Sequence, residues 1–179
     1  ELYTTDDIGF SFEDVMTNKD LVPTVMAVLK KGGEPVKYTR IDDLNFKLTF
    51  KEAYPFFPMI LAGSDPRIIH QFPFHYNKQF HIKYADKTKL EADATAAGFE
   101  FSYQYYANKC GGESAWRNNV DFPVICQWKI TVPPPKLPMV MERNPYFWKV
   151  DTEGNQLPYI DRVEHMVVEK AEVVNLRAI

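Results

Sequence analysis

An alternation of apolar and polar residues between positions 44 and 50 constrains the fold of this chain more than any other feature. The apolar members are Leu44, Phe46, Leu48 and Phe50, and the polar members are Asn45, Lys47 and Thr49. Val36 and Tyr38 alternate in the same way on the other side of Asp42-Asp43. Since this is the period of a β-strand with one buried face, two such runs around a turn predict a β-hairpin.

Other segments have the spacing of helices. Thr4-Thr5-Asp6-Asp7 offers capping oxygens and first-turn carboxylates ahead of helically spaced apolar residues, which predicts a short N-terminal helix. Apolar recurrence and glycine stops predict further helices at 21–31, 59–63, 73–84 and 88–98. The segment 99–120 has no clean period, so only short helical turns are expected there.

Prolines organise the last third of the chain. The prolines at 133–135 and 138 predict an extended connector, and a strand is expected to follow from Met139. Further expected elements are a brief strand at 68–69, a turn at 151–155 and a strand at 163–170. Since no repeat or long linker divides the sequence, these elements predict a single α+β domain over 1–179, with an antiparallel sheet and packed helices.

The charge of the chain is nearly balanced. Its 179 residues include 21 Lys and Arg against 24 Asp and Glu, for a formal net charge of −3, and they contain no basic run. This balance excludes the electrostatic footprint of a nucleic-acid backbone or of an anionic membrane surface. The hydrophobic share of 45% is sufficient for a packed core, so a disordered chain is also excluded. No stretch approaches the roughly 18 apolar residues of a membrane-spanning helix.

Histidines and paired carboxylates fit structural roles better than chemical ones. His70, His75 and His81 do not have the spacing of residues on one helix face, so surface or capping positions are expected for them instead of a metal site. The pairs Asp6-Asp7 and Asp42-Asp43 suit helix caps and turns. The chain also lacks a Gly-x-Ser-x-Gly nucleophile elbow.

The two cysteines, Cys110 and Cys126, leave two alternatives open: one disulfide in an oxidising compartment, or two unpaired thiols. Cys110-Gly111-Gly112 resembles a reactive-thiol sequence, but it has no basic partner that would hold the thiolate. No catalytic residue, metal or cofactor is therefore predicted.

Four motifs resemble one protein family. The run 142–163, with its Asn-Pro-Tyr-Phe-Trp and Pro-Tyr-Ile-Asp-Arg blocks, closely resembles a stretch of the family-five extracellular solute-binding proteins. These are the peptide, nickel and oligosaccharide receptors of ABC importers. Residues 4–8 are similar to the family's Thr-Ala-Glu/Asp-Asp-Val helix start, 41–48 to its Ile-Asp-Asp hairpin, and 74–85 to a helix of one branch.

The resemblance implies a fold and a role. The chain would be an excised subdomain of a type II periplasmic-binding-protein-like fold, inserted in the first lobe of a two-lobed receptor and lacking the remaining lobes. That receptor would capture peptides outside the cytoplasmic membrane and deliver them to an ABC permease, without catalysis. It would be exported to the periplasm or cell surface, and its membrane contacts would run only through the permease or the lipid anchor of a lipoprotein.

Alternatives to a peptide receptor are an oligosaccharide receptor of the same family, a secreted hydrolase domain using exposed carboxylates and aromatic residues, and a structural docking domain. Ligand contacts are expected first at Trp116, Arg117 and Tyr106, which combine stacking rings with a guanidinium able to grip a carboxylate. The motif residues Asn144, Pro145, Tyr146, Pro158 and Tyr159 are expected to shape a turn between strands.

Overall fold

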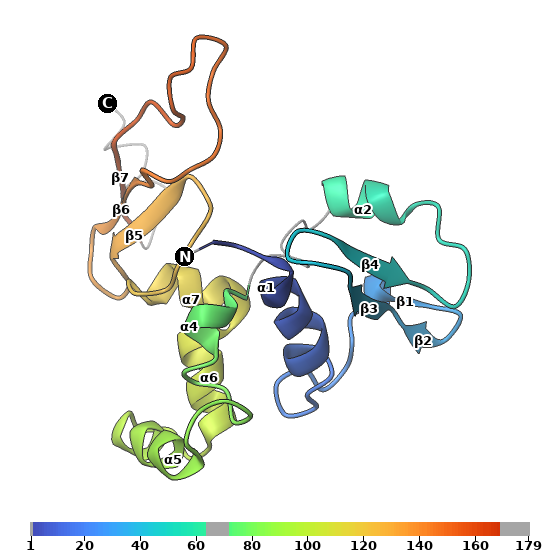
Figure 1. Cartoon of the computed structure of the whole chain (residues 1–179). Coiled ribbons are helices and arrows are strands. Elements are labelled where there is room, and N and C mark those ends of the chain that lie inside the picture. The colour runs from blue at the N-terminus through green and yellow to red at the C-terminus, as the bar shows by residue number, and fades with distance from the viewer. Residues whose placement is uncertain (1, 64–71, 169–179) are drawn as a thin grey trace. The chain divides into compact units, whose positions relative to one another are not determined.

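The computed structural model of this chain describes residues 2–63 and 72–168. The chain divides into two compact units, Glu1–Gly112 and Glu113–Ile179. Helices and antiparallel strands occur together, which confirms the α+β class, although the strands form three small sheets (Figure 1). That 1–179 forms a single domain stays a prediction. Within the described residues, no helix combines the length and apolar character needed to cross a membrane.

The predicted N-terminal helix is confirmed. Helix α1 (Thr5–Phe10) runs on into a π-helical turn, η1 (Ser11–Val15). The Thr4 hydroxyl accepts a hydrogen bond from the Asp6 amide, and the Asp7 carboxylate accepts one from the Thr4 amide at 2.8 Å. This reciprocal capping box satisfies amides that have no partner inside the helix, so the local sequence fixes where α1 begins.

The predicted hairpin is also confirmed. Strands β3 (Lys37–Arg40) and β4 (Phe46–Thr49) pair antiparallel, with Tyr38 opposite Leu48. One hairpin face packs into a cluster formed by α1, η1 and α2 (Phe57–Gly63), whose buried members are Ile8, Phe12, Met16, Leu29, Tyr38 and Phe57. Leu44 lies outside the paired strands at the exposed hairpin tip. The alternation therefore predicted the strand correctly but extended it too far towards the turn.

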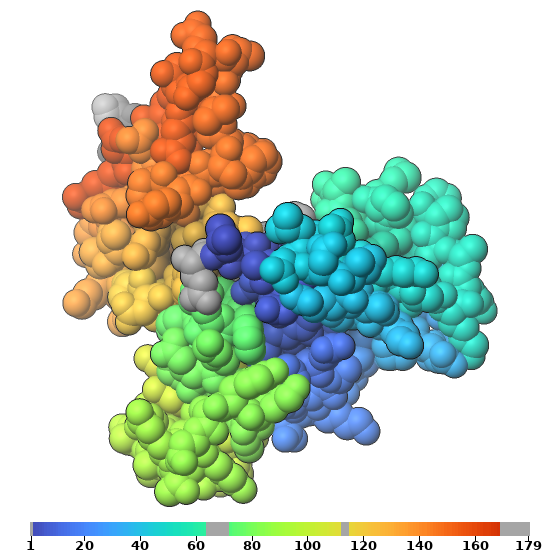
Figure 2. Space-filling view, viewed as in Figure 1, coloured from blue at the N-terminus to red at the C-terminus, as the bar shows by residue number. Residues whose placement is uncertain are grey.

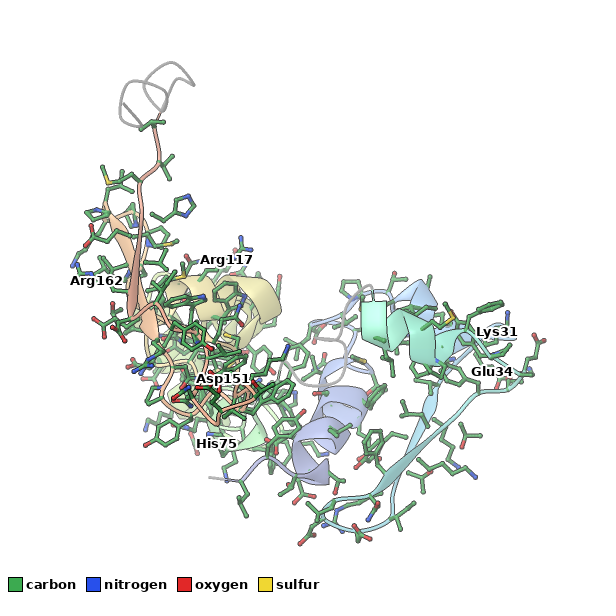
Figure 3. All side chains as sticks on the ribbon, turned by 90° about the horizontal axis from the view of Figure 1, so that it is seen from above. Lys31, Glu34, His75, Arg117, Asp151 and Arg162 are labelled. Atoms are coloured by element: carbon green, nitrogen blue, oxygen red, sulfur yellow. The ribbon has the colours of Figure 1, made fainter. Side chains whose placement is uncertain are left out.

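The helix expected at 21–31 is wrong. Only Ala27–Leu29 forms a short 3-10 turn, and the chain then enters a small hairpin of β1 (Lys30–Lys31) and β2 (Glu34–Pro35). Gly32 and Gly33 have φ of 67° and 78°, which is the left-handed conformation required by both residues of a tight hairpin turn. The two glycines therefore close a β-turn instead of ending a helix, and Lys31 and Glu34 pair across it (Figure 3).

The described part of the first unit has three more helices: α4 (Phe74–Asn77), α5 (Lys87–Ala96) and α6 (Ser102–Cys110). Helix α5 confirms the expectation for 88–98. The helix expected at 73–84 is wrong beyond α4, because hydrogen-bonded turns replace it from Lys78. Helix α6 gives the aperiodic segment more order than expected, and it contributes to a second core cluster of Phe10, Val15, Phe72, Tyr106 and Cys110. The strand expected at 68–69 lies outside the described residues.

The second unit is built on α7 (Gly112–Asn118) and an antiparallel sheet. Its strands, in the order β5-β6-β7, are Trp128–Val132, Met139–Arg143 and Arg162–His165. Val132 pairs with Val140, so residues 133–138 reverse the chain, and the extended connector expected there is wrong. Strand β7 confirms the last predicted strand, although it ends at His165. The turn at 151–155 is confirmed and lies in a loop that projects from the sheet of this unit (Figure 2).

Candidate functional site

An open hollow of about 180 Å³ lies against α1 in the first unit. We call it the α1 hollow. Its aromatic lining comes from Phe10, Tyr38, Phe74 and Tyr84, and its charged lining from Asp6, Glu13, Asp14 and Arg40. Pockets that enclose a drug-sized ligand measure roughly 300–1,000 Å³. The α1 hollow therefore has room for one chemical group of a ligand and not for a whole peptide or oligosaccharide.

Two of the three carboxylates that line the α1 hollow, Asp6 and Asp14, already have partners. Asp6 accepts a hydrogen bond from Arg40 Nε at 3.1 Å. Asp14, whose side chain is only 9% exposed, accepts one from Lys83 Nζ at 2.6 Å and one from the Tyr84 hydroxyl at 2.5 Å. The bond to Asp14 raises the pKa of Lys83, and burial raises that of Tyr84. The lining thus offers charged and aromatic groups, most of which are engaged with one another.

A second hollow, of about 50 Å³, lies between the segment that follows η1, the turns after α4, and helices α5 and α6. His81 and Tyr106 line it, together with Leu90 and Ser102. A liquid water molecule occupies roughly 30 Å³. This hollow is therefore large enough for water and too small for a solute.

Of the three residues predicted to bind ligand, Tyr106 is a core residue, only 3% exposed. Its hydroxyl accepts a hydrogen bond from Asn77 Nδ2 at 3.4 Å, its ring lies edge-on to His81, and desolvation raises its pKa. Trp116 and Arg117 lie together on α7, with the guanidinium carbon 5.1 Å from the indole centroid. The structure thus brings two of the three residues together, and ligand binding by all three stays a prediction.

One of the three histidines, His81, differs from its expected position. His81 is not on the surface: it is 3% exposed, packs edge-on against Phe10, and its Nε2 lies 3.3 Å from the Asp14 carbonyl oxygen. Burial lowers the pKa of His81, which keeps the ring neutral. His70 lies outside the described residues, among which no three His, Cys, Asp or Glu side chains are grouped to hold a metal ion.

The two cysteines are free thiols. Cys110 is fully buried, and desolvation raises its pKa well above the usual range; burial raises the pKa of Cys126 as well. Both shifts disfavour the thiolate, which is the reactive form. Of the two alternatives left open by the sequence, the structure therefore has the unpaired thiols.

Two buried carboxylates, Asp7 and Asp14, make long-range contacts that the sequence did not predict. Asp7 is 4% exposed, and beyond its capping role its Oδ1 accepts a hydrogen bond from the Phe74 amide at 2.7 Å. Asp14 makes its contacts with Lys83 and Tyr84 across a similar sequence separation. The sequence did contain one sign of the Asp14 contacts. Asp14 lies close to the apolar residues Phe12 and Val15, and an aspartate buried beside apolar residues needs a partner for its charge.

The architectural role predicted for Asn144 is supported by its contacts. This side chain is 5% exposed; its Nδ2 donates to the carbonyl oxygens of Val124 at 3.0 Å and Cys126 at 2.9 Å, and its Oδ1 accepts from the Tyr146 amide. One side chain therefore ties the end of β6 to the segment before β5. The loop that follows has the opposite character, because most of its large apolar side chains are exposed.

Comparison with known proteins gives relatives of one kind. No protein-family model matches the chain. The sequence is 31% identical over 166 residues to a periplasmic alpha-galactoside-binding protein of Rhizobium meliloti (strain 1021), covering 91% of this chain and 20% of that protein. The solved structure of an oligopeptide-binding protein, OppA, superposes on 99% of this chain with a TM-score of 0.86 and 33% identity, and 26% of its own length is covered.

Two further solved structures have the same fold. One is the periplasmic binding protein MelB of Agrobacterium fabrum C58 in complex with stachyose, with a TM-score of 0.65, 25% identity and coverage of 94% of this chain and 22% of its own. The other is a peptide-binding protein, AppA, of Clostridium difficile, with a TM-score of 0.60 and 20% identity. The chain spans between 20% and 28% of the length of these proteins. In sequence and in fold, the chain is a relative of the periplasmic solute-binding proteins, as its family-five motifs indicated.

Proposed function

We propose that this chain is part of an ABC-transporter substrate-binding protein that captures peptides or similar solutes outside the cytoplasmic membrane. The observation that carries the proposal is the similarity to the oligopeptide-binding protein OppA, which extends over 99% of the chain at a TM-score of 0.86 and 33% identity. The compartment, periplasmic or cell-surface, and the permease that receives the solute belong to the same proposal.

Solute capture of this kind would need no covalent reaction. A receptor whose solute binds between two lobes is shifted to a closed state by the higher affinity of that state, and a permease can recognise the closed shape. The α1 hollow of the first unit, at about 180 Å³, would supply contacts on one side of such a site. The Trp116–Arg117 pair, in the second unit, is a separate candidate for solute contacts. One side of a cleft cannot clamp a solute, so this chain by itself would bind weakly or not at all.

An oligosaccharide is the second candidate solute. It is favoured by the 31% identity to an alpha-galactoside-binding protein and by the structural likeness to a stachyose complex. Three of the four charged side chains that line the α1 hollow, Asp6, Glu13 and Asp14, are acidic. Arg40 and Lys83 offset the charges of Asp6 and Asp14, so Glu13 is the lining carboxylate outside the described ion pairs. A carboxylate in this position suits a cationic group such as a peptide amino terminus better than an uncharged sugar, which is why peptides come first.

Isothermal titration calorimetry tests the proposal. The complete polypeptide of this reading frame would be titrated with a peptide mixture and, separately, with alpha-galactosides including stachyose. Saturable binding of one class by the complete polypeptide is expected, with little or no heat from the 179-residue chain. No binding of either class, or hydrolysis of the titrated solute, would overturn the proposal. Equal affinity in the 179-residue chain would contradict the one-sided site.

Trp116 and Arg117 can be tested in the same format. Trp116→Ala in the complete polypeptide should weaken solute binding by removing a stacking surface, and Arg117→Gln should weaken binding of a peptide carboxylate in particular. Tyr103→Ala, at an exposed aromatic position on α6, is the matched control. Unchanged affinity in Trp116→Ala removes that residue from the site without affecting the proposed function.

A further inference from the structure

The loop between β6 and β7 exposes large apolar side chains in unusual density. We call residues 145–160 the aromatic arm. Its apolar side chains with more than half of their surface in water are Tyr146 at 89%, Trp148 at 71%, Val150 at 58%, Tyr159 at 65% and Ile160 at 62%. In Figures 1 and 2 the arm stands out from the sheet of its own unit. Clustered exposed apolar side chains commonly mark an interaction surface.

The arm is not a frayed loop, because its backbone is held by its own side chains. Gln156 Nε2 donates to the carbonyl oxygens of Pro145 at 2.8 Å and Phe147 at 2.7 Å. The Leu157 amide donates to the Lys149 carbonyl oxygen at 3.0 Å, and Val150 forms a β-bridge with Gln156. The exposed rings are therefore displayed on a preorganised support, which reduces the entropy lost when they bind.

The tip of the arm is fixed in the same way. The Asp151 carboxylate, which Figure 3 labels, accepts hydrogen bonds from the Tyr159 hydroxyl at 2.6 Å and from the Asn155 side chain at 2.9 Å. These bonds hold the pKa of Asp151 well below its usual range, so the carboxylate stays ionised and the bonds persist at neutral pH. Tyr159 is thus anchored through its hydroxyl while its ring remains exposed.

We propose that the aromatic arm docks on another part of the same, longer polypeptide, and that it is not a site for solute, for a membrane or for a second copy. The proposal rests on the proposed function, since it takes the chain to be part of a receptor. It assigns a contact surface within that receptor, formed by the exposed rings of Tyr146, Trp148 and Tyr159.

Size favours a partner in the same polypeptide. A stable interface between separate proteins uses about 20–30 residues on each side, whereas the whole arm, 145–160, has 16 residues, five of them with exposed large apolar side chains. A tethered partner needs less area, because the linking chain supplies an effective concentration in the millimolar range. The relatives have the necessary additional chain, since this sequence spans only 20% to 28% of their lengths.

Shape and charge disfavour the other partners. Solutes bind in concave sites, and neither the α1 hollow nor the smaller hollow is lined by arm residues. An anionic membrane attracts clusters of Lys and Arg, but the arm has Lys149 as its one cation against Asp151 and Glu153.

Oxidative footprinting with mass spectrometry tests the proposal in the complete polypeptide, with the 179-residue chain as reference. Hydroxyl radicals should oxidise Tyr146 and Trp148 at least fivefold more slowly in the complete polypeptide. This protection should not depend on added solute or on protein concentration. Buried Phe147 is the internal control and should react slowly in both samples.

Three other outcomes would each overturn the proposal. Equal oxidation in both samples means that the arm has no intrachain partner. Protection that appears only with peptide or sugar assigns the arm to the solute site, and protection that grows with concentration assigns it to a second copy. Solute binding measured on the same sample keeps the two proposals separate: binding without arm protection removes the docking proposal alone, and protection without binding removes the receptor function alone.

A double variant provides a second readout. Tyr146→Ser with Trp148→Ser should lower the thermal midpoint of the complete polypeptide by several degrees and leave that of the 179-residue chain nearly unchanged, because the substituted rings are exposed there. The matched control is Lys149→Ser with Glu153→Ser, which changes polar residues of the same arm. Equal effects of the double variant on both polypeptides would overturn the docking proposal.

Discussion

Replacing Asp7 with alanine should destabilise the first unit far more than its position in a six-residue helix suggests. The carboxylate is 4% exposed and accepts two backbone hydrogen bonds, from Thr4 at 2.8 Å and from Phe74 at 2.7 Å. Hydrogen bonds to charged groups contribute about 1.5–3 kcal/mol each, and removing the acceptor leaves the partner amides unsatisfied. Asp7→Ala should therefore lower the free energy of unfolding by about 3–5 kcal/mol.

Urea denaturation followed by circular dichroism measures this loss, and amide hydrogen exchange locates it. With a denaturant slope of about 2 kcal/mol per molar urea, the midpoint should fall by about 2 M. The amides of Thr4 and Phe74 should lose protection first. If Asp7→Ala does not fold, Asp7→Asn serves instead, because its one remaining carbonyl oxygen can keep one of the two bonds and should give a smaller loss.

The neighbouring residue is a matched control. Asp6 lies in the same first turn of α1 as Asp7. Its side chain, however, is 58% exposed and forms an ion pair with Arg40 on the surface. Exposed ion pairs contribute about 0–1 kcal/mol, so Asp6→Ala should change stability by no more than that. Equal effects of Asp6→Ala and Asp7→Ala would refute the reasoning, because burial and backbone acceptance would then not distinguish the two carboxylates.

Three further predictions concern other buried groups. Asn144→Ala should lower the free energy of unfolding by about 2–4 kcal/mol in urea denaturation, since it leaves two carbonyl oxygens and one amide without their partner; Lys129→Ala on the exposed side of β5 should have little effect. Burial lowers the pKa of His81 below its usual 6.5, so its contribution to stability is present above pH 6.5 and is lost as the pH falls below that value. The thermal midpoint should consequently fall less steeply between pH 7 and pH 5 in His81→Phe than in the wild type. His75→Gln is the control. If the dependence of the midpoint on pH is unchanged in His81→Phe but weaker in His75→Gln, His81 is not the responsible group. Iodoacetamide should leave Cys110 unmodified in the native protein and alkylate it after denaturation, as read by mass spectrometry; rapid native alkylation would show that the thiol is not buried.

The elements that the sequence predicted well have signals contained within a few residues. Helix α1 has its capping box at Thr4 and Asp7, and the β3–β4 hairpin has its strict alternation. Helix α5 has Asp86 as a side-chain cap and Gly98, with φ of 85°, just beyond its end. In each case the residues that decide the structure are near neighbours in sequence, so no knowledge of the rest of the fold is required.

The helix expected at 21–31 failed because its decisive signal has two meanings. A Gly-Gly pair can end a helix or form both central residues of a tight hairpin turn, and both conformations have positive φ. The hairpin turn is stabilised by strand pairing between Lys31 and Glu34 and by the burial of Leu29, which is 1% exposed in the first core cluster. Tertiary contacts of this kind outweigh the modest helix propensity of a short segment.

The candidate site was predictable only where its residues are adjacent in sequence. Trp116 and Arg117 are neighbours on one helix, so their contact follows from the chain itself. The burial of Tyr106 depends on Phe10 and Phe72, which belong to distant segments of the same cluster. Residue type alone could not show this burial, because a tyrosine in a core and a tyrosine in a cleft have the same chemistry.

The long-range bonds of Asp7 and Asp14 also bear on the order in which the first unit folds. Asp7 reaches Phe74 across 67 residues, and Asp14 reaches Lys83 and Tyr84 across 69 and 70. All three bonds close nearly the same loop, so the first to form bears most of the closure entropy and the others follow at little further cost. Contacts of such high sequence separation form slowly compared with α1 or either hairpin. The hydrogen bonds of the two carboxylates should therefore form late in folding. Lengthening the chain between Asp14 and Phe74 should slow folding more than it lowers the free energy of unfolding.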